Sequence, residues 1–441
     1  MRWLSILLVV ACGSQSEPVR PPPTNPPVIT VTPDAAAPPS SPPTDAGPPI
    51  VSPIALPPAP EHERANNAAL AKRLDAAVDK AIAEQQLVGV VVMVARDGKL
   101  VYSRGAGLLD REAKLPVRED SMFRLASMTK AIVSATAMLL VEQGKLNLDD
   151  PVTKYLPEFR PKLANGKEPK LTVRHLLTHT SGLSYRFIEK PGTAYHKAEI
   201  SDGLAEPGAP AATNLKRIAS VPLLFEPGSA WHYGLSIDVL GAVMEKAGSN
   251  ELPSLVKELL LRPLGMADTM FAVTDRPRLA WPYAEDKAKT GPPIRMTEPY
   301  DMKDEGKVVR FSPARIFDSG SFPSGGAGLA GTARDYLIFL EAIRTGGAGV
   351  IKPESVRAMS TDQLGAIKGL GGGFGFTYGF GVVTDPVARK TVRGKGTLGW
   401  GGIYGTGFWI DPEAKLSVVM LTNVAGDTPF DRWVEQAIYA K

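Results

Sequence analysis

The sequence predicts an α/β fold in which an antiparallel sheet with flanking helices is built from both ends of the folded chain, with a mostly helical part inserted. Three observations lead to this prediction. A helix-like segment and a strand hairpin occupy residues 66–103, and strand-like segments followed by a helix occupy residues 379–439. Between them, residues 127–345 hold helical segments and long loops rich in glycine and proline. Strands at both ends with helices between them favour a sheet completed by both termini.

The first predicted elements are a helix and a hairpin. Apolar residues in 66–86 recur at helical spacing and share one face, namely Leu70, Leu74, Ala77, Val78 and Ile82. Residues 88–95 are apolar and β-branched, which is typical of a buried strand. Residues 96–99 (Arg-Asp-Gly-Lys) supply a tight turn, and residues 100–103 return as the second strand.

The other end of the chain predicts three strands and a closing helix. The strands are expected at residues 379–383, 405–410 and 416–421, and the helix at residues 428–439. No internal repeat is present, which argues against a solenoid. The predicted folded domain is 62–441, with a sheet part at 62–125 and 345–441 and a helical part at 126–344.

The N-terminal residues predict an export signal and a tether. Residues 1–12 hold one arginine and a short apolar run, well below the roughly 20 apolar residues that a membrane span needs. The residues before Cys12, the single cysteine, resemble a bacterial lipobox, so Cys12 is the predicted lipidation site. The alternative is a plain secretory signal with a chance cysteine. Residues 13–61 are rich in proline and lack aromatic residues, which predicts a disordered linker rather than a proline-rich recognition segment.

The composition argues against several classes of function. Lys+Arg number 50 against 46 Asp+Glu, and this near balance is spread along the chain, so no nucleic-acid partner is expected. One cysteine argues against a disulfide framework or a cysteine-ligated metal, and the five histidines form no HExxH motif. Neither of the two GxGxxG strings has both the strand before it and the helix after it that a dinucleotide site needs. We therefore expect no cofactor and no metal.

A candidate nucleophile lies at residues 127–130, Ser-Met-Thr-Lys. On a helix, residues three apart share a face, so the hydroxyl of Ser127 and the amine of Lys130 can meet, and a serine hydroxyl needs such a base to become a nucleophile. A second such pair, Ser254 and Lys257, lies on an amphipathic helix where the lysine reaches water. Residues 131–141 carry no charge, which predicts a buried helix behind Lys130. Because burial makes the ammonium costly, this context favours Ser127 and Lys130 as the reactive pair over Ser127 as a simple N-cap.

Several blocks of the chain, in the order of a known family, resemble the SxxK serine hydrolases: class C β-lactamases, low-molecular-weight penicillin-binding proteins and family VIII carboxylesterases. The blocks are FRLASMTK at 123–130, GKLNLDDP at 144–151, LLTHTSGL at 176–183, EPGSAWHY at 226–233, GGAGLAGTARDYLIF at 325–339, WGG at 400–402 and FWIDP at 408–412. They cover nearly all of the predicted folded part. The resemblance implies a β-lactamase/transpeptidase-like fold with a sheet domain and a helical domain.

The resemblance also implies roles for individual residues. Ser127 would be the nucleophile, Lys130 its proton partner and Tyr233 the tyrosine of the second motif. A phenol needs a nearby cation to act as a base, and Lys130 would supply it; which of the two takes the serine proton is left open. The backbone amides of Ser127 and Ile403 would form the oxyanion hole.

Two departures from the family pattern bear on the substrate. The second motif reads Tyr-Gly-Leu, so Leu235 stands where relatives often carry an asparagine that grips a substrate amide. Trp400, with Gly401 and Gly402, stands where many relatives carry Lys-Thr-Gly, and no lysine is left to attract a carboxylate. Both changes remove polar recognition and leave the reactive groups in place. They favour the carboxylesterase branch, with Trp400, Gly401, Gly402 and Leu235 as substrate-binding residues.

The sequence therefore predicts a serine hydrolase that cleaves small-molecule carboxylic esters, with amides as the alternative substrates, through an acyl-enzyme on Ser127. The near alternative is a β-lactamase or D-Ala-D-Ala carboxypeptidase, and the distant one is a non-catalytic envelope lipoprotein. The histidines of the family blocks, His179 and His232, are expected to be structural. The expected location is the bacterial cell envelope, with a membrane anchor through Cys12.

Overall fold

The computed structural model describes residues 56–58, 67–206, 210–286, 288, 291–304, 306–367 and 371–440. The predicted signal peptide, Cys12 and most of the predicted linker lie outside these described residues. Within them, no helix combines the length and the apolar character that crossing a bilayer requires.

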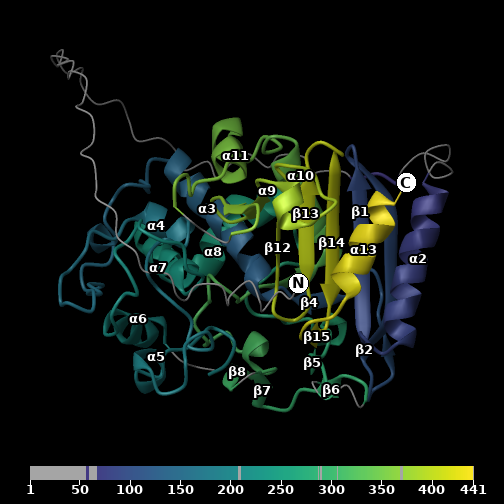
Figure 1. Cartoon of the computed structure of the whole chain (residues 1–441), viewed down its shortest axis with the longest axis horizontal. Coiled ribbons are helices and arrows are strands. Elements are labelled where there is room, and N and C mark those ends of the chain that lie inside the picture. The colour runs from purple at the N-terminus through teal and green to yellow at the C-terminus, as the bar shows by residue number, and fades with distance from the viewer. Residues whose placement is uncertain are drawn as a thin grey trace. The chain divides into compact units, whose positions relative to one another are not determined.

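An eight-stranded sheet forms the centre of the fold, and its strands come from both ends of the described chain (Figure 1). The strand order is β10-β11-β12-β13-β14-β1-β2-β3, and neighbouring strands are antiparallel. The bounds are β1 Gly89–Arg96, β2 Lys99–Asp110, β3 Leu115–Pro116, β10 Phe374–Phe376, β11 Gly381–Val383, β12 Leu398–Gly401, β13 Gly407–Asp411 and β14 Leu416–Thr422. The N-terminal and C-terminal halves join where β1 pairs with β14, with Val92 opposite Met420. The predicted sheet is confirmed.

One face of the sheet is covered by α2 (Ala68–Ala83) and α13 (Phe430–Tyr439), which contact each other (Figure 1). Because side chains alternate along a strand, one set of β1 residues points to this face. The core on this side combines apolar residues of both helices with Val90, Val92, Val94, Val418 and Met420. The periodicity that predicts the first helix therefore marks the face that packs on the sheet.

The opposite face of the sheet is contacted by α10 (Ala333–Arg344), which packs against β1, β13 and β14. The sequence analysis placed this segment with the helical part, but its contacts place it on the sheet. The side-chain oxygen of Thr332 caps its first turn by accepting from the amide of Asp335. Its residue Tyr336 is fully buried and donates a hydrogen bond to the carbonyl of Met128, 2.9 Å away. This helix thus links the sheet to the turn that carries Ser127.

The helical part is built around α3 (Thr129–Glu142), which is buried from Thr129 to Leu140 and contacts α7, α8 and α11. The uncharged run after Lys130 is therefore a buried helix, as predicted. The other helices of this part and its surroundings are α4 Val173–Leu177, α5 Ala194–Lys197, α6 Ala211–Ala219, α7 Ser236–Gly248, α8 Leu252–Val256, α9 Arg262–Leu264, α11 Pro353–Ser360 and α12 Pro386–Arg389.

Short strands that the sequence analysis did not predict also occur, most of them in the middle of the chain and one after β14. They are β4 Met122–Arg124, β5 Tyr283–Ala284, β6 Ile294–Arg295, β7 Tyr300–Asp304, β8 Lys307–Phe311, β9 Ala330–Thr332 and β15 Val424–Ala425. The β4–β9 pair matters most for function, because it lies directly before Ser127 in the chain. Pairs of two or three residues lack the length over which a period of two can be read from sequence.

Candidate active site

Ser127 lies on a tight turn between β4 and α3. Ala126, directly before it, adopts a left-handed backbone conformation with φ of 45°, which is costly for a residue with a Cβ. The turn is held on both sides, because Leu125 donates its amide to the carbonyl of Leu329 at 2.9 Å and Thr129 accepts from the Leu329 amide at 3.0 Å. The strained turn projects Ser127 at the mouth of the buried helix, where its side chain keeps partial exposure.

Lys130 is brought to Ser127 by the first turn of α3, as the spacing predicts. Its Nζ lies 3.1 Å from Ser127 Oγ and 2.8 Å from the carbonyl oxygen of Gly326, and the residue is only 1% exposed. The second pair, Ser254 and Lys257, differs because Lys257 is exposed. The structure thus confirms that only the first of these two pairs joins a buried lysine to its serine.

Tyr233 completes the cluster from the loop before α7. Its ring centroid lies 4.7 Å from Lys130 Nζ, and its hydroxyl oxygen accepts a hydrogen bond from Trp400 Nε1 at 3.4 Å. The loop is held from behind by His179, whose carbonyl accepts from the His232 amide and whose Nδ1 accepts from the Gly234 amide. The sequence-predicted residues Ser127, Lys130, Tyr233 and Trp400 therefore gather in one place.

The strand β12 ends beside the Ser127 turn. After Gly401 the chain turns, with the Gly402 amide donating to the carbonyl of Thr406 at 2.8 Å. A Cβ placed on Gly402 would come closer than 3.0 Å to the carbonyl oxygen of Leu125. Ile403, the next residue, packs against the apolar cluster that contains Ala126. The two backbone segments of the predicted oxyanion hole are therefore direct neighbours.

Three of the predicted residues serve the structure rather than the cleft surface. The side chain of Leu235 is 0% exposed, so the prediction that it contacts the substrate is wrong for this structure. The prediction rested on the position of Leu235 in the motif, which does not indicate the direction of the side chain. His179 is fully buried, and burial together with the charge of Lys130 keeps its pKa well below the usual value. His232 is also largely buried and contacts Ser184 Oγ through Nε2 at 3.0 Å. Neutral, internally bonded histidines fit the structural role predicted for them.

Asp238 is a site residue that the sequence analysis missed. On the first turn of α7, its Oδ1 accepts from the hydroxyl of Ser324 and from the amide of Gly326, the residue whose carbonyl receives Lys130. Its Oδ2 is buried and has no hydrogen-bond partner among the described residues. Burial raises its pKa, whereas the charge of Lys130 opposes that rise. Asp238 therefore holds the carbonyl that positions Lys130 and faces the lysine with a carboxylate.

Replacing Asp238 by asparagine is expected to lower kcat on an ester about 10-fold with little change in KM. The amide can keep the contacts of Oδ1 but removes the charge that stabilises the nearby ammonium. Steady-state kinetics of Asp238→Asn beside Asp335→Asn, a buried aspartate on α10, would separate this effect from general damage. Equal losses in the two variants would contradict a role for the Asp238 charge.

A second buried carboxylate, Asp202, supports the loop that flanks Tyr233. It accepts from the amides of Arg186 at 2.7 Å and Phe187 at 3.2 Å. These residues follow Tyr185, whose ring lies 5.4 Å from that of Tyr233. Burial raises the pKa of Asp202 to about 7. A carboxyl group at this position titrates in the neutral range and not near pH 4.

The raised pKa of Asp202 predicts a pH-dependent stability. Because the folded protein holds this proton more tightly than the unfolded chain, whose aspartate pKa is about 3.9, the free energy of unfolding should fall as pH rises from about 4 through 7. Asp202 alone should lower the free energy of unfolding by at most about 4 kcal/mol over this range. In urea unfolding, the difference in the free energy of unfolding between pH 5 and pH 8 should be smaller for Asp202→Asn than for the unmodified protein. Identical differences would contradict the assignment.

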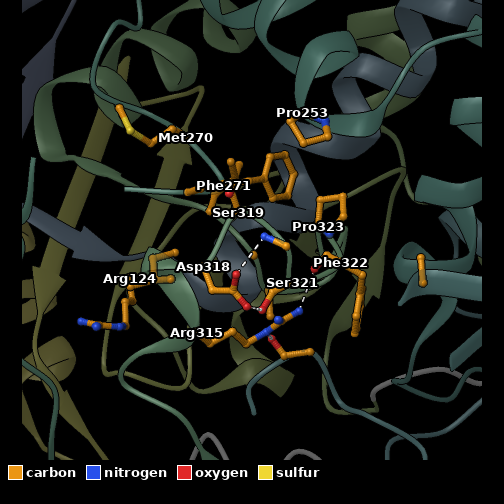
Figure 2. A pocket seen from close by; sticks show the side chains of 18 of the residues that line it. Arg124, Pro253, Met270, Phe271, Arg315, Asp318, Ser319, Ser321, Phe322 and Pro323 are labelled. Carbon is orange, nitrogen blue, oxygen red and sulfur yellow. Dashed lines mark hydrogen bonds between the residues drawn. The ribbon is translucent and has the colours of Figure 1, made fainter. Parts of the chain in front are cut away.

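A separate cavity of about 630 Å³ lies on the other side of the segment 327–329. Figure 2 shows Arg315 crossing it toward Phe322, whose carbonyl accepts from Nη2 at 2.7 Å, while Asp318 accepts from Ser321. Among the described residues that line this cavity, none belongs to the catalytic cluster of Ser127, Lys130 and Tyr233. The catalytic cluster and this cavity are therefore distinct features.

Comparison with known proteins agrees with this geometry. Residues 74–440 match the Beta-lactamase family. Esterase EstB of Burkholderia gladioli is 45% identical over 381 residues, which cover 85% of this chain and 96% of that esterase. The solved structure of EstCE1, described as a hydrolase with promiscuous acyltransferase activity, is 36% identical with a TM-score of 0.80 and covers 85% of this chain and 100% of its own. A class C beta lactamase from Rhodobacter sphaeroides, 21% identical with a TM-score of 0.60 over 83% of this chain and 98% of its own, shares the fold. The chain therefore belongs to the beta-lactamase family and is a serine ester hydrolase of its esterase-related branch.

Proposed function

We propose that this hydrolase cleaves uncharged carboxylic esters through an acyl-enzyme formed on Ser127. The observation that carries the proposal is the contact between Lys130 Nζ and Ser127 Oγ, 3.1 Å long, at the mouth of a buried helix. A serine with a hydrogen-bonded base at this distance is the arrangement that nucleophilic catalysis needs. The relationship to named esterases supports the same reaction class.

The first half of the reaction forms the acyl-enzyme. Ser127 Oγ attacks the ester carbonyl carbon while its proton passes to the pair formed by Lys130 and Tyr233. The carbonyl oxygen becomes an oxyanion, which the amides of Ser127 and Ile403 stabilise where the β12 turn meets the Ser127 turn. The bond between the carbonyl carbon and the alcohol oxygen then breaks, and Tyr233 returns the proton to the leaving alkoxide.

The second half releases the acid. A water molecule gives up a proton to the same pair and attacks the acyl carbon, and the bond to Ser127 Oγ breaks as the serine recovers its proton. The carbonyl of Gly326, held by Asp238, keeps Lys130 in place through both halves. Residues Ser127, Lys130 and Tyr233 thus serve both steps without any further group.

The residues beside Ser127 support uncharged substrates. Trp400 stands at the end of β12 and offers an indole face together with a single N–H donor, which is directed at Tyr233. A β-lactam or a peptide carboxylate calls for a cation at this place, since a carboxylate binds best to a paired positive charge. Gly401 and Gly402, which follow Trp400, add no charged or polar side chain to this place. These features support esters over the β-lactamase and carboxypeptidase alternatives.

A panel of substrates tests the proposal on the full chain. We expect kcat/KM for 4-nitrophenyl butyrate to exceed that for a chromogenic cephalosporin or a D-Ala-D-Ala peptide by at least about 100-fold. A 4-nitrophenyl alkylphosphonate should stop the reaction and leave one covalent adduct on the peptide that contains Ser127. A preference for the cephalosporin would support the β-lactamase alternative. Turnover of none of the three would support the non-catalytic lipoprotein.

The location of the enzyme is a further part of the proposal. The lipobox-like residues before Cys12 support export and lipid attachment to that cysteine, followed by a proline-rich tether. In a bacterial host the unmodified chain should partition into the detergent phase of a phase-separation assay. Cys12→Ser should move it to the aqueous phase, whereas equal partitioning of both chains would contradict anchoring through Cys12.

A further inference from the structure

Two stacked aromatic rings, Trp400 and Phe374, lie between Tyr233 and the edge strand β10 of the sheet. Trp400 on β12 and Phe374 on β10 lie nearly parallel, with an interplanar angle of 10° and ring centroids 6.4 Å apart. Trp400 also contacts Tyr233, with ring centroids 5.4 Å apart. Beyond Phe374, the guanidinium carbon of Arg389 lies 4.4 Å from the Phe374 ring centroid. Contacts thus join Tyr233 to Trp400, Trp400 to Phe374, and Phe374 to Arg389.

The stack depends on a glycine in the strand between the two rings. Gly381 lies on β11, which pairs with β10 on one side and with β12 on the other. A Cβ at Gly381 would come closer than 3.0 Å to the ring of Phe374 and would lie 3.1 Å from the ring of Trp400. The absent side chain leaves the space in which the two rings approach each other across β11.

The position of Trp400 and Phe374 relative to Tyr233 indicates which part of the ester they would contact, namely the alcohol. In the proposed reaction, the leaving alcohol oxygen must lie close to the hydroxyl of Tyr233 to receive its proton. Trp400 Nε1 lies 3.4 Å from that same hydroxyl. The group carried by the leaving oxygen therefore passes beside Trp400 and continues toward Phe374, which keeps partial exposure on an edge strand.

The other aromatic pair near Tyr233 is less suited to this task. Tyr185 and Phe187 are stacked at 16° with ring centroids 4.8 Å apart. Phe187 is partly exposed, as Phe374 is, but it packs against the apolar cluster that contains Phe311 and Tyr404. No hydrogen bond between Tyr185 and the Tyr233 hydroxyl occurs in the described part of the chain.

We propose that Trp400 and Phe374 form the binding subsite for the alcohol part of the ester and select alcohols that carry a flat aromatic ring, an assignment that rests on the proposed hydrolase function. A planar ring can pack closely against the two side chains, whereas a saturated ring of the same size is puckered and makes fewer close contacts. The guanidinium of Arg389 lies over one face of the Phe374 ring and thereby holds the ring in its orientation. Phe374 is thus a specificity-determining residue and Arg389 a positioning residue.

Matched esters test the subsite. Benzyl butyrate and cyclohexylmethyl butyrate share their acyl group and an unactivated primary alcohol, and differ in the planarity of the ring. We expect the unmodified full chain to favour the benzyl ester by about 5- to 10-fold in kcat/KM, measured by acid release in a pH-stat. Each kcat/KM is divided by the kcat/KM of the same protein for methyl butyrate, an ester without a ring, so that changes in general activity cancel.

Variants identify the residues responsible. Phe374→Leu should bring the benzyl preference close to 1, while Phe187→Leu, the matched change in the other pair, should leave it unchanged. Arg389→Gln should reduce the preference partly, and Arg389→Lys, which keeps a cation, should restore part of it. A preference near 1 in the unmodified protein, or a full preference in Phe374→Leu, would overturn the assignment while methyl butyrate turnover leaves the hydrolase proposal standing. Loss of turnover on all three esters by the folded, unmodified chain would overturn both.

Discussion

Ser127→Ala is expected to lower kcat/KM for 4-nitrophenyl butyrate by about 10⁴-fold or more. Without Oγ, 3.1 Å from Lys130 Nζ, no acyl-enzyme can form, and the remaining acceleration comes only from substrate binding and oxyanion stabilisation. The fold should persist, because Ser127 is a partly exposed residue and loses a single atom. Equal melting temperatures of the two proteins would check this point.

The control for this variant is Ser254→Ala. Ser254 on α8 and Lys257, directly after α8, repeat the spacing of Ser127 and Lys130, but Lys257 is exposed. We expect Ser254→Ala to retain the activity of the unmodified protein within about 2-fold, in line with ordinary surface-helix substitutions. Labelling with the alkylphosphonate should disappear in Ser127→Ala and persist in Ser254→Ala. Retained activity in Ser127→Ala would show that another group is the nucleophile.

The contact between Ser127 and Lys130 could be predicted from the sequence because it is local. Ser127 and Lys130 are three residues apart, and the uncharged residues after them indicate burial without knowledge of any other segment. The sheet was predictable for a similar reason, since the apolar runs of β1 and β14 each indicate their own burial. The motif order then placed Tyr233 and Trp400 beside the pair.

Other parts of the site depend on contacts between distant segments. Asp238 acts through Gly326, 88 residues away, and no pattern in either segment indicates that the two meet. The stack of Phe374 on Trp400 requires the pairing of three strands and the absence of a side chain at Gly381. Leu235 shows the converse limit, because its motif position indicated a substrate contact and its backbone turns the side chain into the core.

Gly402→Ala is expected to lower kcat about 100-fold, by displacing the turn that carries the Ile403 amide. The new Cβ would come closer than 3.0 Å to two oxygens, the carbonyl of Leu125 and the hydroxyl of Thr406. The carbonyl belongs to the backbone of the Ser127 turn and cannot rotate away, so the β12 turn must move instead. Movement by a fraction of an ångström separates the two amides that stabilise the oxyanion.

A neighbouring glycine provides the matched control for Gly402→Ala. At Gly407, on β13, a Cβ would meet the flexible end of Met420 at 3.2 Å and the carbonyl oxygen of Trp400 at 3.9 Å. Gly407→Ala should therefore retain kcat within about 3-fold, because a methionine side chain can adjust. If the oxyanion hole is the cause, Gly402→Ala should lose kcat with little change in KM and should also bind a phosphonate transition-state analogue more weakly. A loss confined to KM would instead assign Gly402 to substrate binding, since uniform binding affects KM and leaves kcat unchanged.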